Sequence, residues 1–151
     1  MRTRTCPGCA LVLPRADGPA HPYLGASPEC WARFGAYLVA GGGEAATDVY
    51  AVQHPGSAER RAVQSVGAHL MWLCLLLERG ARAGAQPAAL RRILAARPGF
   101  VHLPPPEPNG GVTVADVLAG RRTSRAWALD VWEAWRPHHA QVRHWVDAVF
   151  G

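Results

Sequence analysis

The first residues whose type and spacing could do chemistry are two cysteines near the amino terminus, in the motif Cys6-Pro-Gly-Cys9. Two thiolates at this spacing can point into one tetrahedral metal shell, because the turn between them folds back with its amides toward the sulfurs. A redox pair would instead be expected at a strand–helix junction, with its first cysteine at the start of the helix. We predict no strand before Cys6, so the motif favours a zinc site over a redox centre.

A CxxC motif supplies half of a tetrahedral site, so two more ligands are needed. Cys30 is the best third ligand, because it lies three residues after Ser27, a predicted helix cap, where the helix dipole and free amides favour a thiolate. The fourth is His21, in the same amino-terminal segment, or else His54. Alternatively, Cys30 is a small buried residue that only packs, and His21 is an ordinary loop histidine. Cys74 is expected to pack in the core. The predicted zinc ligands are therefore Cys6, Cys9, Cys30 and His21.

A second group of polar residues belongs to the middle and the end of the chain. His69 lies within one turn of an apolar helical seam, where a polar group must find a partner. If the group converges, it could form an acid–base pair with Asp48 orienting a histidine, or bind a catalytic metal with an open position. The alternative is that His69 is a core histidine bonded to a carbonyl and that the later histidines lie on the surface. The candidate catalytic residues are Asp48, Tyr50, His54, His69, His138 and His139.

The candidate residues must be positioned by predicted helices, which are separated by segments rich in glycine and proline. Ser27-Pro28 is a strong helix start, and Ser57 is expected to cap the longest helix, which ends at Gly80. No segment shows strand alternation. The expected helices span about 29–40, 47–53, 58–79, 87–96, 114–119, 124–136 and 137–150. We predict an all-α protein, a single compact bundle of six or seven helices forming one domain (1–151), with an irregular zinc-knuckle-like head (1–28) and a helical body (29–151).

Composition narrows the functional classes. The formal net charge is +5 and all 16 basic residues are arginine, but they occur as isolated pairs, which disfavours nucleic-acid binding. The longest apolar stretch, 70–77, is too short to cross a bilayer, so no membrane association is expected. The amino terminus lacks the apolar region of a secretory signal. We therefore expect a cytoplasmic protein.

Several motifs, in order along nearly the whole chain, resemble a family of small, mostly actinobacterial proteins catalogued as a domain of unknown function. They are CPGC, GPAHPY, SPECW, DVYAVQHPG, SVGAHLMWLCLLLERG, TVADVL and WEAWRPHHAQVRHW. The resemblance implies an intact single-domain member and supplies no activity. By motif match, the family's polar positions fall on Cys6, Cys9, His21, Cys30, Asp48, Tyr50, Gln53, His54, His69, His138 and His139. Two departures are Ala10, where such knuckles usually have glycine, and a shortened segment at 41–44.

The sequence favours a zinc-binding enzyme that acts on a small molecule, for example in bacterial secondary metabolism. A non-catalytic, zinc-stabilised module that binds a protein partner is the alternative, and a nucleic-acid-binding regulator is third. No nucleophile elbow, phosphate loop or dinucleotide fingerprint is present, so the reaction class is open. The oligomeric state is also open, a dimer included.

Overall fold

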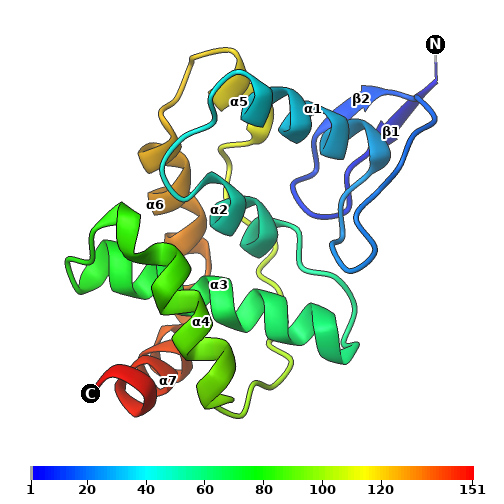
Figure 1. Cartoon of the computed structure of the whole chain (residues 1–151). Coiled ribbons are helices and arrows are strands. Elements are labelled where there is room, and N and C mark those ends of the chain that lie inside the picture. The colour runs from blue at the N-terminus through cyan, green and yellow to red at the C-terminus, as the bar shows by residue number, and fades with distance from the viewer. Residues whose placement is uncertain (1) are drawn as a thin grey trace.

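Seven α-helices and one two-stranded sheet make up the computed structural model, which describes residues 2–151 (Figure 1). The helices are α1 (Pro28–Val39), α2 (Ala46–Gln53), α3 (Arg60–Glu78), α4 (Gln86–Ala96), α5 (Val114–Leu118), α6 (Ser124–Ala134) and α7 (His139–Phe150). Short 3-10 turns at Ala83–Ala85 and Arg136–His138 precede α4 and α7. The prediction of a mainly helical protein is confirmed.

The amino-terminal segment contains a small sheet, which departs from the all-α fold that the sequence predicts. Strands β1 (Thr3–Thr5) and β2 (Val12–Pro14) pair antiparallel, with Arg4 opposite Leu13. The prediction that no strand precedes Cys6 was therefore wrong. Each strand has three residues, too few to show an alternating pattern in the sequence. The CPGC motif forms the turn of this hairpin and not a strand–helix junction.

The helix boundaries follow local signals closely. The Ser27 hydroxyl accepts a hydrogen bond from the Cys30 N–H, as expected for the cap of α1. The α3 cap differs from expectation, because the Glu59 carboxylate, and not Ser57, accepts from the N–H of Arg61. Ser57 accepts from the Glu59 N–H one step earlier. α3 consequently begins about one half-turn later than predicted.

Helix α3 lies at the centre of the helical body and packs against α2, α4, α6 and α7 (Figure 1). Its predicted seam is buried at Val66, Leu70 and Leu73, and Cys74 beside it is also buried. Burial on several sides stabilises the fold mainly through the hydrophobic effect. No helix in the described part of the chain is long and apolar enough to cross a membrane.

A buried polar network fixes the end of α2 and the connector that precedes α5. The fully buried Gln53 amide donates to the carbonyls of Asn109 and Val112 and accepts from the Trp127 indole N–H. Asn109 in turn donates to the carbonyls of Val52 and Gln53 and accepts from the Trp135 indole. The residue that follows Gln53 is His54, so the same network fixes the position of that histidine.

Candidate metal centre

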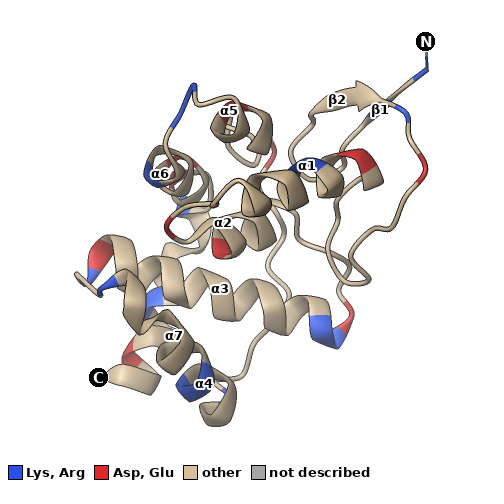
Figure 2. Cartoon of the chain, turned by 45° about the horizontal axis from the view of Figure 1, so that its top comes forward, with Lys and Arg blue, Asp and Glu red and all other residues tan. Residues whose placement is uncertain are grey.

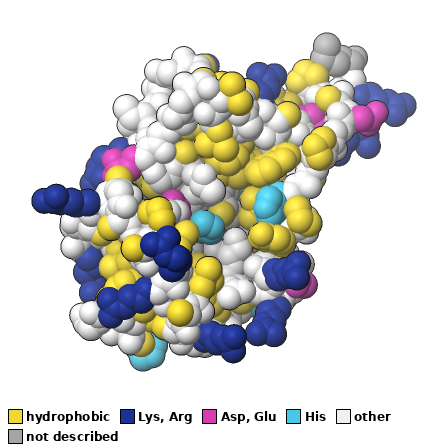
Figure 3. Space-filling view, in the orientation of Figure 1, with side chains coloured by type: hydrophobic (Ala, Val, Ile, Leu, Met, Phe, Trp, Pro, Cys, Tyr) yellow, Lys and Arg dark blue, Asp and Glu magenta, His cyan; other side chains and the backbone are white. Residues whose placement is uncertain are grey.

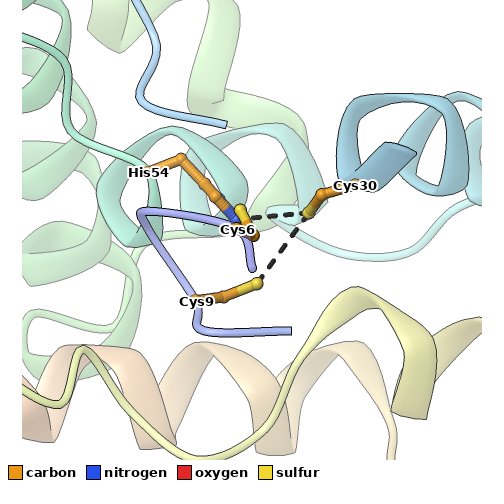
Figure 4. A group of neighbouring side chains, drawn as sticks. All are labelled: Cys6, Cys9, Cys30 and His54. Atoms are coloured by element: carbon orange, nitrogen blue, oxygen red, sulfur yellow. Dashed lines mark hydrogen bonds between the residues drawn. The ribbon is translucent and has the colours of Figure 1, made fainter. Parts of the chain in front are cut away.

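Three cysteines and one histidine converge between the hairpin and the helical body (Figure 4). The ligand atoms of Cys6, Cys9, Cys30 and His54 all lie within 4.8 Å of one another. Cys6, Cys30 and His54 are buried, and Cys9 is partly buried. The four residues come from three separate places: the hairpin turn, the first turn of α1 and the end of α2.

Two of the distances between donor atoms are close to those of a tetrahedral zinc shell. Zinc–sulfur bonds of about 2.3 Å at tetrahedral angles place two sulfurs about 3.7–3.8 Å apart, and a sulfur and a nitrogen slightly closer. The Sγ atoms of Cys9 and Cys30 are 3.8 Å apart, and Cys30 Sγ is 3.4 Å from His54 Nε2. Three thiols and one imidazole are a donor set that can hold a metal ion, and two of its distances already suit a tetrahedral shell.

Hydrogen bonds from outside the cluster orient two of its members. The Nδ1 of His54 is 2.8 Å from the carbonyl oxygen of Tyr50, so an Nδ1–H donates there and Nε2 faces the sulfurs. The Tyr50 hydroxyl donates to Cys30 Sγ at 3.2 Å, and its ring stacks on His54 with centroids 3.9 Å apart. Because Tyr50 and His54 are one helical turn apart, one short helix supplies both contacts.

Two glycines, one in the hairpin turn and one before α1, allow the amino-terminal segment to lie against His54 and Pro55. A Cβ atom at Gly8 would meet His54 Cδ2 at 2.5 Å and two backbone oxygens at 2.8 and 2.9 Å. A Cβ at Gly25 would meet the Pro55 carbonyl oxygen at 2.4 Å, and the Gly25 N–H donates to the carbonyl of His54. Both glycines are required by close approach and not by an unusual φ angle.

The pKa values of the cluster's thiols shift in different directions. Hydrogen bonding from Cys30, followed by that from Cys9, lowers the pKa of the Cys6 thiol. The same contact with Cys6, together with Cys9 and burial, raises the pKa of Cys30. Burial, with Cys30 next to it, also raises the pKa of Tyr50, so the tyrosine keeps its proton and donates a hydrogen bond to Cys30 Sγ. A bound cation would favour the thiolate form of all three cysteines.

The structure places His54, and not His21, beside the three thiols. His21 Nδ1 accepts from the Tyr23 N–H, and its ring packs edge-on against Tyr23 and Trp31. The prediction of His21 rests on its place in the same segment as the CPGC motif, but the turn after α2 brings His54 closer. The Cys30 position is as expected, and Cys74 lies in the core.

The other candidate residues do not form one pocket. Asp48 and His69 pair, with the Asp48 Oδ1 2.6 Å from the His69 Nδ1, and Gln86 donates to the same Oδ1 at 3.1 Å. Tyr50 and His54 belong to the metal cluster. His138 Nε2 is 2.7 Å from the Pro104 carbonyl, and His139 Nε2 is 2.8 Å from that of Trp132. The polar residues thus divide into separate sites, because α7 lies on the other side of α3 from α2.

Some residues at these sites carry no sequence signal that identifies them. Gln86 precedes the Pro87 helix start and looks like an ordinary first-turn residue, yet it is a partner of Asp48. Gly8 is part of the CPGC motif, but its contact with His54 depends on how the hairpin docks. His54 itself could be found from its place at the end of a helix, in the motif Gln53-His54-Pro55-Gly56.

Fold and site together define a small, mostly helical protein with a candidate metal centre of three cysteines and one histidine. Residues 4–136 match the family described as a family of unknown function, DUF5946, and the chain belongs to that family. No curated protein matches the chain, and no solved structure matches it.

Proposed function

We propose that the chain binds one zinc ion through Cys6, Cys9, Cys30 and His54, and that this ion has a structural role. The observation that supports it is the closed shell: four protein donors within 4.8 Å of one another, three of them buried. Structural zinc sites have four protein ligands, whereas catalytic sites keep one position for water or substrate. The hairpin would then be a zinc knuckle fixed to the helical body.

Metal analysis tests this proposal with a control that the chain itself provides. Freshly purified protein should contain one zinc per chain by native mass spectrometry. Cys6→Ser should lose the metal and much of the stability, because structural zinc binding is coupled to folding. Cys74→Ala removes the remaining cysteine, which lies in the core, and should retain the metal. Wild-type protein without metal, or equal metal loss in both variants, would overturn the proposal.

The second function we propose is general acid–base chemistry on a small molecule at Asp48 and His69. The supporting observation is their 2.6 Å contact: the Asp48 side chain is 3% exposed and that of His69 is 17% exposed. In this arrangement His69 donates its Nδ1 proton to the carboxylate, and Nε2 can accept a proton from a bound molecule. Asp48, fixed by Gln86, stabilises the imidazolium that forms. His69 is the candidate catalytic residue, and Asp48 positions it.

The tautomer of His69 tests the acid–base proposal before any substrate is known. Nitrogen-15 correlation spectra should show His69 in the Nδ1–H form, and Asp48→Asn should change the tautomer distribution. Gln86→Leu is a milder control that removes only the second bond to Asp48. A His69 found as the Nε2–H tautomer in the wild-type protein would contradict this role, because its free nitrogen would then face Asp48.

The surface favours these functions over the two alternatives. Six of the 16 arginines form ion pairs, and the basic residues are distributed over several helices (Figure 2). Nucleic-acid binding requires them on one face. The exposed large apolar residues come from several elements, with at most two on any one of them, which gives no specific support to a partner surface. All four cysteines are free, as is typical of proteins in a reducing compartment, which supports a cytoplasmic location.

A further inference from the structure

A trough runs along the first half of α3, next to α4. It consists of two adjoining hollows of about 520 and 360 Å³ that share Gln64 and Leu94 as lining residues. The first is also lined by Val63 and Phe100, which give it an apolar floor. Figure 3 shows histidine side chains in the middle of this face and several arginines below them.

The charged residues that line the trough are all basic. Arg60 and Arg97 line the larger hollow, and Arg61 lines the smaller one. Among residues 2–151, no carboxylate lines either hollow, and none of the three arginines forms a salt bridge. The neighbouring Glu59 carboxylate accepts from a backbone N–H at the start of α3. Figure 2 shows basic residues at the start of α3, with an acidic residue directly before them.

The opposite end of the trough contains His69. Arg61, Ser65 and His69 are four residues apart on α3 and line the same hollow, so they share one face of the helix. At 1.5 Å per residue, the step from Arg61 to His69 is about 12 Å along the helix axis. His69 uses Nδ1 to contact Asp48, and its Nε2 has no hydrogen-bond partner within the described chain.

We propose that this trough binds a small organic oxyanion with an apolar body. The carboxylate or phosphate group pairs with Arg60, Arg61 and Arg97, whose guanidinium groups bind such oxyanions in a fork. The apolar body lies on Leu94 and Val63 and extends toward Nε2 of His69. This last step rests on the proposed acid–base function of His69; the binding of the anion does not.

A binding experiment with matched probes tests the proposal. Metal-loaded, nitrogen-15-labelled full chain is titrated with 4-phenylbutyrate, with 4-phenylbutyl phosphate and with the neutral 4-phenylbutanol. We expect saturable amide shifts at Gln64, Ser65 and Leu94 with one or both anions and none with the alcohol. The carboxylate and phosphate arms show which oxyanion is preferred. Shifts confined to other regions, or equal binding of the alcohol, would overturn the proposal.

Variants then assign the binding to the arginines. Arg61→Ala and Arg97→Ala should each weaken anion binding about tenfold, the lower range for charge-assisted hydrogen bonds. Arg33→Ala removes an exposed arginine of α1 that lines neither hollow and should leave binding unchanged. Equal effects of Arg33→Ala and Arg61→Ala would refute the assignment.

The same samples separate the proposals from one another. Loss of metal without loss of anion binding would count against the zinc proposal only. Absence of anion binding in protein with its full metal content would overturn the trough inference and leave the zinc site intact. The tautomer of His69 is read independently of both results.

Discussion

Replacing Gly8 by alanine should test how closely the hairpin docks on His54. The new Cβ would lie 2.5 Å from His54 Cδ2, 2.8 Å from the Gln53 carbonyl oxygen and 2.9 Å from that of Gly25. Ordinary contacts begin at 3.4 Å, so each atom must retreat by half an ångström or more. Two of the three are backbone atoms, and the His54 ring is fully buried, so no flexible side chain can absorb the change.

Overpacking of a close-packed site costs roughly 1–3 kcal/mol, and the reduced freedom of the unfolded chain returns about 0.4–1 kcal/mol. The expected net cost is therefore about 1.3 kcal/mol of unfolding free energy. For a protein of this size, that cost lowers Tm by roughly 3–5 °C. Displacement of the His54 ring also moves Nε2 away from Cys30, so metal affinity should fall by about tenfold or more.

Urea unfolding and a competition titration with a zinc-binding dye measure the two effects. Gly18→Ala is the matched control, because it lies in the same segment, has an ordinary φ and finds nothing within 4 Å of the added Cβ. It should change stability by less than about 0.5 kcal/mol. If Gly8→Ala behaves like Gly18→Ala in both assays, the docking geometry described for the hairpin is refuted.

Three further changes test other parts of the structure. Ala10→Gly should raise the unfolding free energy by up to about 1 kcal/mol in urea titrations, because Ala10 has a φ of 63° that glycine adopts without strain; a loss of stability would contradict this. The Ala16 N–H donates to the buried Glu29 carboxylate and holds its pKa below the usual value of 4.5. The ionised carboxylate therefore stabilises the folded protein above pH 4.5, and this stabilisation is lost as the pH falls through the lowered pKa. In Glu29→Gln, the unfolding free energy should therefore decrease less between pH 4.5 and lower pH than in the wild-type protein. The same decrease in both proteins would refute this. Gln53→Leu should cost about 3 kcal/mol by thermal unfolding, since it leaves the Trp127 indole and two carbonyls without partners; a cost below about 1 kcal/mol would show that water replaces them.

The helices could be predicted from the sequence because their signals are local. Ser27-Pro28 marks the start of α1, and the Gly/Pro segments separate the later helices to within a few residues. The capping pair at α5 also formed, with the Thr113 N–H donating to the Asp116 carboxylate. These features depend on neighbours four or fewer residues apart, so no knowledge of tertiary packing was required.

The site could be predicted only in part, because its completion is a tertiary event. The spacing of the two cysteines in the CPGC motif is enough to predict that they share a site. His54 joins them only because α2 packs beside the hairpin turn. Sequence proximity favoured His21, but proximity along the chain does not measure distance after folding. The Asp48–His69 pair also depends on the packing of α2 against α3, which no local pattern specifies.

The distribution of the cluster over residues 6 to 54 has a consequence for biosynthesis. A nascent chain emerges amino terminus first, so the two hairpin cysteines leave the ribosome long before the imidazole that completes the shell. During that interval a captured ion would have an incomplete set of donors and could exchange with other thiol ligands in the cell. Completion of the shell would coincide with the docking of α2, which depends on later residues as well, because Gln53 at the end of α2 is bound to Asn109 and to Trp127.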